Sequence, residues 1–428
     1  MKKLIIADDL TGSMESALVA FRLGQFAELR FPWASGDSIA FNGHETVVLD
    51  TETRNLPERL AEEGLAKLLG QSGVALAYKK IDSTLRGNVV AEIRGIDAAS
   101  GPRLQETGHQ KKKILFFCPA LPEQGRSIVS SQVFVRGIAL ENTEYAHDPL
   151  KPAMSGDTIA LMRKAGYEAG SIGLGIVRQG PDSIESEIRV LIRDGFDCVI
   201  PDAETRGDLL SIALAMRSLE HVPEGAQKAI HEPCDFLPIG SAGLLEALFK
   251  TDRIVQVRDS SDELASTKGS RRIPHLVIVS GSRSATTLSQ LELLRNTCAP
   301  ERYQVFAPAE VDVDSEKEGP KGADGQRSAA SGVAAFEEKV RDCAFRAERE
   351  LRHFPDSVLF LTGGHTARIV LETLGVGGAE ILGEPALLVP LCRAVGGRFD
   401  GLRFMTKAGG FGAPTLFGDI LENAGRKE

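Results

Sequence analysis

The stretch LIIADDLTGSMESA, from Leu4 to Ala17, places two aspartates directly after a short apolar run. The run is typical of a buried strand, and after Asp9 the apolar spacing changes to that of a helix. Two adjacent carboxylates at a strand end repel each other, so we expect a neighbouring group that favours negative charge. A metal ion, a substrate hydroxyl and an aspartyl-phosphate are the alternatives at this point.

The same theme repeats along the first two thirds of the chain and predicts an α/β fold. Apolar runs are continuous, and helix-like segments such as 58–69 and 183–194 separate them, as is typical of a parallel sheet covered on both faces. The runs are KLIIAD, TVVLDTETR, ALAYKKIDST, KILFFCPA, SIGLGIV and DCVIPDAET. Because ligands bind outside the carboxyl ends of parallel strands, we expect the polar residues that follow these runs to line one crevice. These residues are Asp8, Asp9, Asp50, Thr51, Asp82, Ser83 and Asp202.

The length of 428 residues predicts two domains. The expected limits are an N-terminal domain over 1–250, a linker over 251–272 and a C-terminal domain over 273–428, with an exposed loop or disordered insertion over 314–332. Each domain is expected to hold a largely parallel sheet with helices on both faces, and the active site is expected in the cleft between the domains.

Composition argues against several classes of protein. The net charge of −9 disfavours a nucleic-acid-binding surface. The six cysteines form no C-x-x-C pair and the histidines no H-x-x-x-H pair, so we expect reduced cysteines and no zinc site. The first apolar run is too short for a signal peptide and no run is long enough to span a membrane, which predicts a cytoplasmic protein. The oligomeric state stays open, a homo-oligomer included.

Three small-residue turns in the C-terminal third favour a phosphate-bearing ligand. VIVSGSRSATT and LFLTGGHTAR are strands that run into such turns and then into helices, and KAGGFG, residues 407–412, sets a lysine beside glycines. Small residues let the backbone approach a ligand closely, and a helix N-terminus offers N–H groups to an anion. Each turn alone is also ordinary structural punctuation. The patterns of a P-loop and of a dinucleotide fingerprint are both absent from the sequence.

The segment YKKIDSTLRGN, residues 78–88, concentrates lysines, an aspartate, hydroxyls and an arginine after a predicted strand, and Arg54 adds a second guanidinium. Arginine binds carboxylates through two parallel hydrogen bonds, and Ser83, Thr84 and Asn88 suit hydroxyl groups. The combination predicts a site for a small hydroxy acid. The alternative is a solvated loop with internal salt bridges.

Eight motifs, in the same order, make the chain resemble the four-carbon acid sugar kinase family. They are ADDLTG, KKIDSTLRGN, CPALPEQGR, DAET, GSAGL, SGSRS, TGGHTA and KAGGFG, and they cover nearly the whole chain. The resemblance implies a substrate-binding N-terminal domain, a nucleotide-binding C-terminal domain, and ATP-dependent phosphorylation of a terminal hydroxyl of a small carbohydrate acid. Threonate, erythronate, 3-oxo-tetronate and branched relatives such as 3-oxo-isoapionate are the acids that members of this family are thought to use.

The resemblance also implies site residues, matched motif by motif. Those assigned to the substrate are Asp9, Arg54, Asp82, Ser83, Thr84 and Leu85. Those assigned to ATP are Ser280 or Ser282, Gly363, Gly364, His365, Thr366, and Gly409 or Gly410. The chain departs from the family at three positions. It has His365 where the family often has an acidic residue, Arg283 where the family has a cysteine, and Glu15 where the family has an aspartate. The last departure suggests a substrate unlike the best-known ones.

A mechanism by direct transfer follows from these assignments. We expect Arg54 and Arg86 to hold the substrate carboxylate and Asp9 to orient, and to deprotonate, the terminal hydroxyl. Asp8 would tune Asp9 or help to hold Mg²⁺ through water, while the protein itself supplies no metal cluster. Lys407 would lie near the β- and γ-phosphates, and the two domains would close over both substrates.

Two rival functions stay open at the level of sequence. A haloacid-dehalogenase-like phosphotransferase needs aspartates at positions i and i+2, and here Leu10 takes the second position. A non-catalytic sugar-acid sensor would fit the departures at Arg283 and His365.

Overall fold

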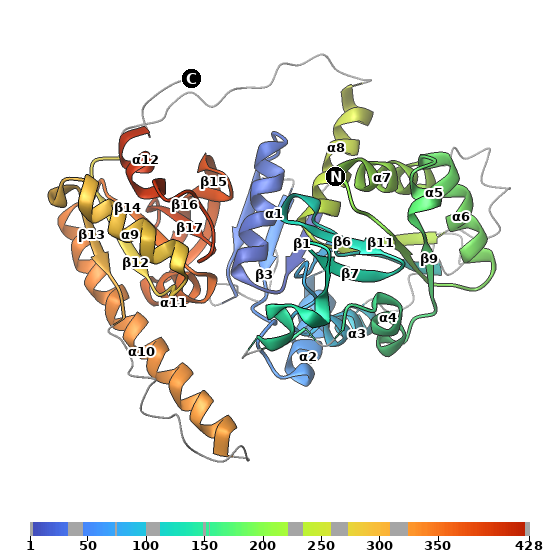
Figure 1. Cartoon of the computed structure of the whole chain (residues 1–428), viewed down its shortest axis with the longest axis horizontal. Helices are drawn as coiled ribbons and strands as arrows, with labels where there is room; N and C mark the ends of the chain where they lie inside the picture. Colours follow the sequence, from blue (N-terminus) through green and yellow to red (C-terminus); the bar gives the residue numbers. More distant parts are fainter. Residues whose placement is uncertain are drawn as a thin grey trace. The chain divides into compact units, whose positions relative to one another are not determined.

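The computed structural model describes residues 3–32, 46–72, 75–99, 112–148, 151–153, 155–220, 234–257, 273–308 and 324–423. The chain divides into two compact units, Met1–Leu264 and Ala265–Glu428 (Figure 1). The predicted domain limits stay predictions, because most of the expected linker, 258–272, lies outside the described residues. Its first seven residues, expected to be linker, are helical, since helix α8 (Ala242–Val257) continues through them.

The first unit holds a parallel sheet with the strand order β2-β3-β1-β4-β11-β5-β10-β9. The strands are β1 (Lys3–Ala7), β2 (Ala27–Arg30), β3 (Thr46–Asp50), β4 (Leu76–Lys80), β5 (Lys112–Cys118), β9 (Ala169–Ile172), β10 (Cys198–Pro201) and β11 (Cys234–Gly240). Strands β3, β1 and β4 are neighbours, and Ala7 pairs with Asp50 and with Lys80. The carboxyl ends of these three strands therefore bring Asp8, the segment after Asp50 and the segment after Lys80 to one edge.

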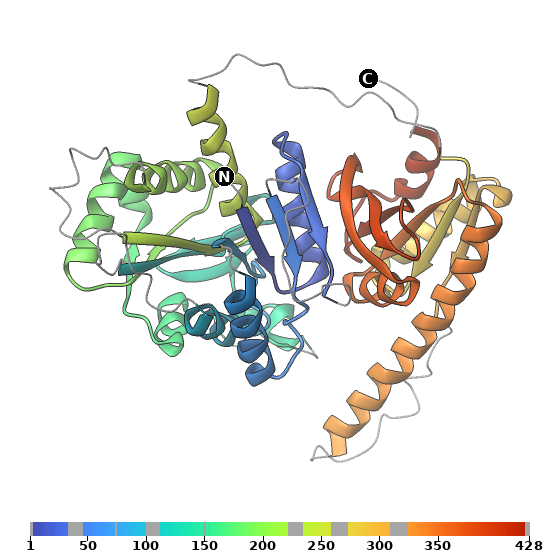
Figure 2. The ribbon, with the colours of Figure 1, turned by 180° about the vertical axis from the view of Figure 1, so that it is seen from behind.

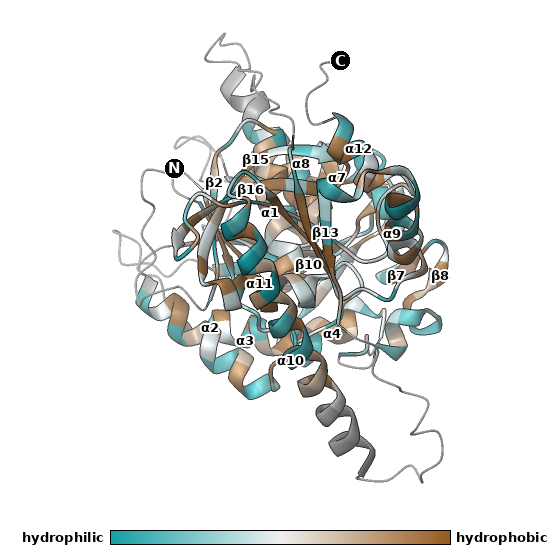
Figure 3. Ribbon diagram, turned by 90° about the vertical axis from the view of Figure 1, so that its left-hand side faces the viewer, coloured by the Kyte–Doolittle hydropathy of each residue, from teal (hydrophilic) through white to brown (hydrophobic). Residues whose placement is uncertain are grey.

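Helices cover both faces of this sheet, as Figures 1 and 2 show. One face carries α1 (Leu10–Arg22), α6 (Pro181–Arg193), α7 (Arg206–Glu220) and α8. Neighbouring helices pack together in the order α1-α8-α7-α6, and the short α5 (Leu174–Val177) packs against α6 and α7. The other face carries α2 (Glu58–Ser72), α3 (Val89–Ala99) and α4 (Thr158–Ala165). Figure 3 shows α2 banded in hydrophobic and hydrophilic residues, as expected of a helix with one buried side.

A small antiparallel sheet, absent from the sequence prediction, follows β5. Its strands are β6 (Arg126–Val129), β7 (Gln132–Val135) and β8 (Ile138–Ala139), and the single-turn helices η1 (Pro122–Gln124), η2 (Leu140–Asn142) and η3 (Glu144–His147) flank them. Asp202, expected in the crevice, instead accepts hydrogen bonds from the Ser130 and Ser131 N–H groups at 2.7 and 2.9 Å. Asp202 therefore holds the turn of this small sheet. It follows β10, which lies three strands away from β4 in the parallel sheet.

The second unit holds a mixed sheet with the order β13-β12-β14-β17-β16-β15. The first four strands, β13 (Tyr303–Phe306), β12 (Leu276–Ser280), β14 (Val358–Thr362) and β17 (Arg403–Lys407), are parallel. The hairpin of β15 (Val376–Ala386) and β16 (Val389–Gly397) extends the sheet in antiparallel fashion. The parallel part of this unit agrees with the prediction, and the hairpin is an addition to it.

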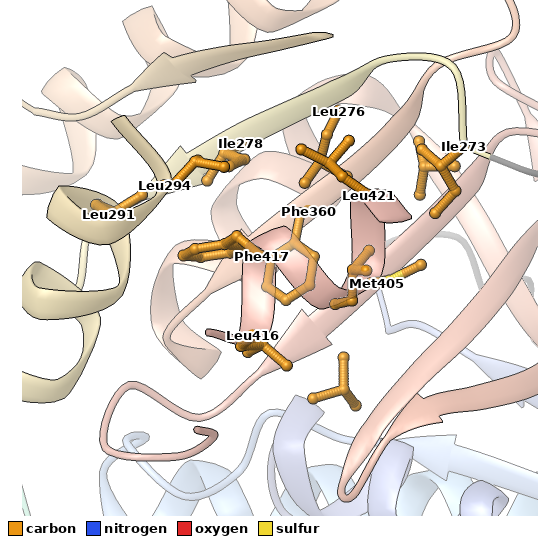
Figure 4. Close-up of a cluster of buried hydrophobic side chains, with 13 residues drawn as sticks. Ile273, Leu276, Ile278, Leu291, Leu294, Phe360, Met405, Leu416, Phe417 and Leu421 are labelled. Atoms are coloured by element: carbon orange, nitrogen blue, oxygen red, sulfur yellow. The ribbon is translucent and has the colours of Figure 1, made fainter. Parts of the chain in front are cut away.

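Helices also cover both faces of the second sheet. Helices α9 (Ala285–Thr297) and α12 (Leu416–Asn423) pack together, and α10 (Asp324–His353) packs against α11 (Gly364–Leu374). Figure 4 shows the core between the sheet and the α9–α12 pair, where the Phe360 and Phe417 rings meet edge to face at 5.0 Å. Residues 324–332, expected as part of a loop, form the first turns of α10, and 314–323 lie outside the described residues.

Candidate active site

Asp9 is the residue at which strand β1 becomes helix α1. Its backbone is extended, and its Oδ1 accepts a hydrogen bond from the Gly12 N–H at 2.8 Å, so Asp9 caps the helix. A Cβ atom at Gly12 would come within 2.9 Å of Asp9 Oδ1 and 3.1 Å of Lys80 Nζ, so glycine is needed there. Asp8 is 1% exposed and the Asp9 side chain 18%, so Asp9 is the aspartate that a ligand can reach.

Arg54, from the loop after β3, resolves the repulsion between the two aspartates. Its Nε and one terminal nitrogen donate to the two oxygens of Asp8 at 2.8 and 3.0 Å, and its other terminal nitrogen donates to Asp9 Oδ2 at 2.6 Å. Burial would raise the pKa of Asp8, but Arg54, Lys79 and Lys80 outweigh it and hold that pKa below its usual range. Burial raises the pKa of Asp9, against Arg54 and with the help of Asp8.

The loop after β4 carries the other predicted substrate residues. Asp82 Oδ2 accepts hydrogen bonds from Thr84 Oγ1 and Arg86 Nε, each at 2.6 Å. Burial opposes the charge on Asp82, but Arg54 and Arg86 outweigh it and hold its pKa well below the usual range. Ser83 and Leu85 are buried, and Leu85 adopts a positive φ of 55°, so this loop holds a backbone conformation that is unfavourable for leucine.

Gly87 joins the two loops. Its φ is +100°, and a Cβ atom there would lie 3.1 Å from Arg54 Cγ and 3.3 Å from Asp8 Oδ2. The RGN segment therefore needs glycine both for its backbone conformation and for its close approach to the Arg54–Asp8 pair.

Buried polar groups beneath the site support the Arg54 loop. Lys79 and Glu92 are both almost fully buried and lie 3.1 Å apart, and Glu92 also accepts a hydrogen bond from the Thr53 hydroxyl. Asn88, expected to bind substrate hydroxyls, instead donates to the carbonyls of Thr53 and Leu56, each at 2.7 Å. Its side chain is therefore used to position the loop that carries Arg54.

The sequence places Lys80 among the cations expected near the two aspartates but gives it no further role. Its Nζ lies 3.1 Å from Glu15 Oε2, and the other oxygen of Glu15 accepts from Gln124 Nε2 at 3.3 Å. Burial would lower the pKa of Lys80, but Glu15, Asp8 and Asp9 outweigh it and keep the ammonium charged. Glu15, one of the departures from the family pattern, thus reaches this cluster, whereas the preceding residues Ser13 and Met14 are buried.

The CPALPEQGR motif contributes residues that sequence reasoning left without a function. Arg126 donates to Gln124 Oε1 at 2.9 Å and to the Tyr145 hydroxyl at 2.9 Å. Arg86 also lies over the Tyr145 ring, and it pairs with Asp148 at 3.0 Å. The sequence signal that could have pointed to this role is Arg126 itself, which ends the polar, proline-containing segment after a predicted strand.

In the second unit, Lys407 organises the glycine-rich turn after β17. Its Nζ donates to Thr287 Oγ1 at 2.8 Å and to the carbonyls of Gly409 and Phe411 at 3.1 and 3.2 Å. Ser284 and Thr287 also donate to the Gly409 carbonyl, at 2.5 and 2.6 Å. Burial lowers the pKa of Lys407 to about 8.

The three predicted small-residue turns meet because β12, β14 and β17 are neighbouring parallel strands. A Cβ atom at Gly409 would collide with the Ser282 hydroxyl, and one at Gly281 with the Thr366 hydroxyl. Gly363, with φ +90°, is the N-cap of helix α11 and donates its N–H to the Lys407 carbonyl at 2.9 Å. The backbones thus form a closely packed surface beside a helix N-terminus, which suits phosphate groups.

The predicted nucleotide residues differ in where their side chains lie. The Ser280 hydroxyl is buried and accepts a hydrogen bond from Thr362 at 2.9 Å, so of the two serine alternatives Ser282 is the one beside the glycine turn. His365 contacts helix α10: its Nε2 lies 3.2 Å from Glu337 Oε1, and its ring stacks on Phe336. Burial and Arg368 lower the pKa of His365, so the imidazole is neutral at neutral pH. The side chain of Arg283 is exposed.

Two searches of the described residues bear on metals and membranes. Across them, His, Cys, Asp and Glu side chains form no group of three or more that could ligate a metal ion. Asp8, expected to help hold Mg²⁺, has both carboxylate oxygens bonded to Arg54. Within the same ranges, no helix is both long and apolar enough to span a membrane.

These observations define a class of protein: an α/β chain with one site suited to a hydroxylated acid and a second site suited to phosphate groups. The chain belongs to the four-carbon acid sugar kinase family. Residues 3–248 match the family model of a sugar-binding N-terminal domain, and residues 314–417 match that of a nucleotide-binding C-terminal domain. The predictions of the family and of the α/β fold are confirmed.

Two curated relatives and one solved structure illustrate the similarity. A D-threonate kinase of Salmonella typhimurium is 28% identical over 98% of each chain, and a 3-oxo-tetronate kinase of Brucella melitensis is 24% identical over 97% of this chain and 94% of the other. A crystal structure of a Salmonella typhimurium protein superposes with a TM-score of 0.74 at 19% identity, covering 99% of both chains, and so shows the same fold.

The site geometry also disfavours the aspartyl-phosphate alternative. Leu10, at the position where that chemistry needs an aspartate, is 2% exposed and is the first residue of α1. Asp8, the nucleophile in that scheme, is buried and bonded to Arg54 through both oxygens. A sugar-acid kinase agrees with the family and with both sites.

Proposed function

We propose that this protein transfers the γ-phosphate of ATP to a terminal hydroxyl of a small sugar acid, with four carbons or a branched relative. The observation that carries this proposal is the Asp8–Asp9–Arg54 cluster, which leaves Asp9 partly exposed at the end of β1. The family match and the relatives' printed activities support the same reaction.

Asp9 is the proposed general base. A general base works best when its pKa lies near the pH of the medium, and the pKa of an ordinary carboxyl lies well below neutral pH. Burial raises the pKa of Asp9 towards that range. Its bond to Gly12 N–H and its ion pair with Arg54 fix the carboxylate, so that a hydroxyl could approach the remaining lone pairs. Arg54 is then the residue that positions Asp9, since the two aspartates accept all the hydrogen bonds that Arg54 donates to side chains among the described residues.

The second unit is the proposed ATP site, and its glycines support that assignment. The Gly409 and Gly281 positions have no room for a side chain, which is typical of backbone that must approach another group closely. The phosphates would be held by the small residues of the three turns, which are Ser282, Gly363, Gly364, Thr366, Gly409 and Gly410. Lys407 would keep the Gly409 and Phe411 carbonyls turned towards itself, so that N–H groups of the turn are left for phosphate oxygens.

Mg²⁺ is proposed as part of the nucleotide substrate. Mg²⁺ keeps several waters and binds through phosphates plus one or two carboxylates, so it does not require a protein cluster. The ion would neutralise charge on the phosphates, and Asp9 would stay available for the hydroxyl.

The proposal is tested by measuring ADP formation with a panel of tetronates, 3-oxo-tetronates and branched acids. We expect Mg²⁺-dependent ADP formation that requires one of these acids. If every acid in the panel leaves ADP formation at the level seen without acid, the kinase assignment fails.

A further inference from the structure

The cations first expected to bind the substrate carboxylate already face carboxylates of the protein. Arg54 pairs with Asp8 and Asp9, and Arg86 pairs with Asp82 and Asp148. Lys79 and Lys80 face Glu92 and Glu15 in the same way. A negatively charged substrate that approached any of these four cations would also meet the paired carboxylate, which repels it.

Two other cations around the same loops have neutral partners. The guanidinium of Arg126 donates to the side chain and carbonyl of Gln124 and to the Tyr145 hydroxyl, and its Nε is buried without a hydrogen-bond partner. The Nζ of Lys151 donates to Asn88 Oδ1 at 2.9 Å. Among the described residues, neither side chain forms an ion pair, so neither cation has a carboxylate oxygen within 4 Å of its nitrogens.

A chain of contacts, called the arc below, links Arg126 to Lys151. Arg126 and Arg86 both lie over the Tyr145 ring, at 5.7 and 5.2 Å from its centroid. Arg86 also pairs with Asp148, which accepts a hydrogen bond from the backbone N–H of Lys151 at 3.1 Å.

Each end of the arc also contacts a segment next to the Asp8–Asp9–Arg54 cluster. Asn88, the partner of Lys151, bonds the loop of Arg54, while Gln124, the partner of Arg126, bonds Glu15 beside Lys80. Both side chains are only partly buried, so a small ligand can reach them.

We propose that Arg126 and Lys151 bind the carboxylate of the sugar acid. This inference rests on the proposed function, and it changes the roles expected from the sequence: Arg54 positions Asp9, and Arg86 orders the Asp82 loop and Tyr145. A carboxylate bound by two cations at this arc leaves the hydroxyl end of the acid for Asp9. Specificity for acids over neutral polyols is then a property of Arg126 and Lys151.

The test compares acids with matched neutral polyols on the full-length protein. The probes are D-threonate and D-erythronate, against threitol and erythritol, in which a hydroxymethyl group replaces the carboxylate. Dissociation constants are measured by calorimetry for the wild type and for Arg126→Gln and Lys151→Met, with kcat and KM for the acid that is phosphorylated. Arg189→Gln is the control, because Arg189 pairs with Glu185 on helix α6.

We expect the wild type to prefer an acid over its polyol, and each site variant to weaken acid binding by about 10-fold or more, since charge-assisted hydrogen bonds are the strong ones. Polyol binding should change little, KM should change more than kcat, and Lys151→Arg should restore most of the acid affinity. Equal losses for acid and polyol would indicate a structural role and overturn the proposal. Unchanged acid binding in both variants, or no preference of the wild type for an acid, would also overturn it.

The two proposals fail in different ways. Acid-dependent ADP formation with unaffected Arg126 and Lys151 variants would overturn the carboxylate site and leave the kinase assignment intact. Acid binding that depends on Arg126 and Lys151, without phosphate transfer to any acid, would overturn the kinase assignment and support the carboxylate site.

Discussion

Arg54 lets two adjacent aspartates occupy one strand end, because a single guanidinium donates hydrogen bonds to both carboxylate oxygens of Asp8 and to one carboxylate oxygen of Asp9. The result is asymmetric. Asp8 is buried with a lowered pKa and holds the arginine, whereas Asp9 is partly exposed with a raised pKa and can meet a hydroxyl. The chemical difference between two identical side chains thus comes from their surroundings.

Asp9→Asn tests the role of this carboxylate. Asparagine caps a helix about as well as aspartate, so the fold should be kept while the base is lost. We expect kcat to fall by about 10²-fold or more, with a smaller change in the dissociation constant of the acid. The matched control is Asp157→Asn, because Asp157 caps helix α4 in the same way. Near-normal turnover by Asp9→Asn would remove Asp9 from the role of base.

Asp50, the last residue of β3, should make stability depend on pH. It is fully buried, its Oδ2 has no hydrogen-bond partner, and burial followed by Glu52 and Asp9 raises its pKa well above the usual value. A carboxyl whose pKa is higher in the folded state stabilises the fold at low pH, and this contribution is lost as the pH rises through the folded-state pKa.

The variant Asp50→Asn carries no charge, so it should not lose stability in this way. We expect its free energy of unfolding relative to the wild type to increase between about pH 5 and about pH 8, by about 1 kcal/mol or more. Urea unfolding at both pH values measures the difference, with Asp157→Asn as control. A difference between variant and wild type that is the same at both pH values would contradict a raised pKa for Asp50.

Gly87→Ala separates backbone strain from crowding at the site. Both Gly87 and Gly180 have φ near +100°, but a Cβ atom meets Arg54 and Asp8 only at Gly87 and has open space at Gly180. Both alanine variants should lose about 1–2 kcal/mol of stability from the backbone conformation. We expect Gly87→Ala alone to reduce kcat/KM, by about 10-fold or more, because it displaces the Arg54–Asp8 pair. Equal kinetic effects in the two variants would contradict this reading of Gly87.

At the scale of elements, the glycine-rich turn after β17 is organised by the lysine that begins it. The Lys407 ammonium bonds the carbonyls of its own turn and the hydroxyl of Thr287 on helix α9. Strand β17, helix α9 and the turn are therefore joined at one charged group.

The dissociation constant of ATP should depend on the protonation of Lys407. Because the pKa of Lys407 is about 8, raising the pH from neutral removes the positive charge and should weaken ATP binding. We expect an increase of about 10-fold in the dissociation constant across this titration, and Lys407→Met should bind weakly at every pH. Calorimetry over the range gives both curves. A pH dependence that persists in Lys407→Met would assign the titration to another group.

The elements that the sequence predicted are those with two buried faces. Strands β1, β3, β5 and β10 are largely apolar runs of buried residues, whereas β4 ends on two buried lysines. Strand β11 was missed because its segment CDFLPIG is interrupted by Asp235 and Pro238. The run SIGLGIV was expected as one strand, but β9 ends at Ile172 and a short helix follows Gly173. The hairpin β15–β16 was missed because its glycines obscure the strand pattern.

The candidate site was predictable in its residue types but not in its pairings. Asp9, Arg54 and Asp82 come together as expected, because β3, β1 and β4 are adjacent parallel strands. The bond of Arg54 to both aspartates depends on the register in which Ala7 pairs with Asp50, which no local pattern encodes. Tyr145 and Asp148 lie in a segment without periodic pattern, so their approach to Arg86 could not be inferred.

At the scale of the whole molecule, the proposed function assigns one half of the chemistry to each compact unit. The first unit holds carboxylates and cations at the ends of three parallel strands, and the second holds three small-residue turns at the ends of three others. Phosphate transfer requires the two substrates to meet in line, so the proposed function would require residues of both units. The expectation that the active site lies between the domains stays a prediction.

The measurement that tests this account most directly is detection of the phosphorylated acid. Full-length protein is incubated with ATP, Mg²⁺ and each acid of the panel, and the products are followed by phosphorus NMR and mass spectrometry. The account predicts one phosphate ester on a terminal hydroxyl, formed in equal amount to ADP, and strongly reduced formation by Asp9→Asn. Release of inorganic phosphate without any sugar-acid phosphate, or undiminished transfer by Asp9→Asn, would contradict it.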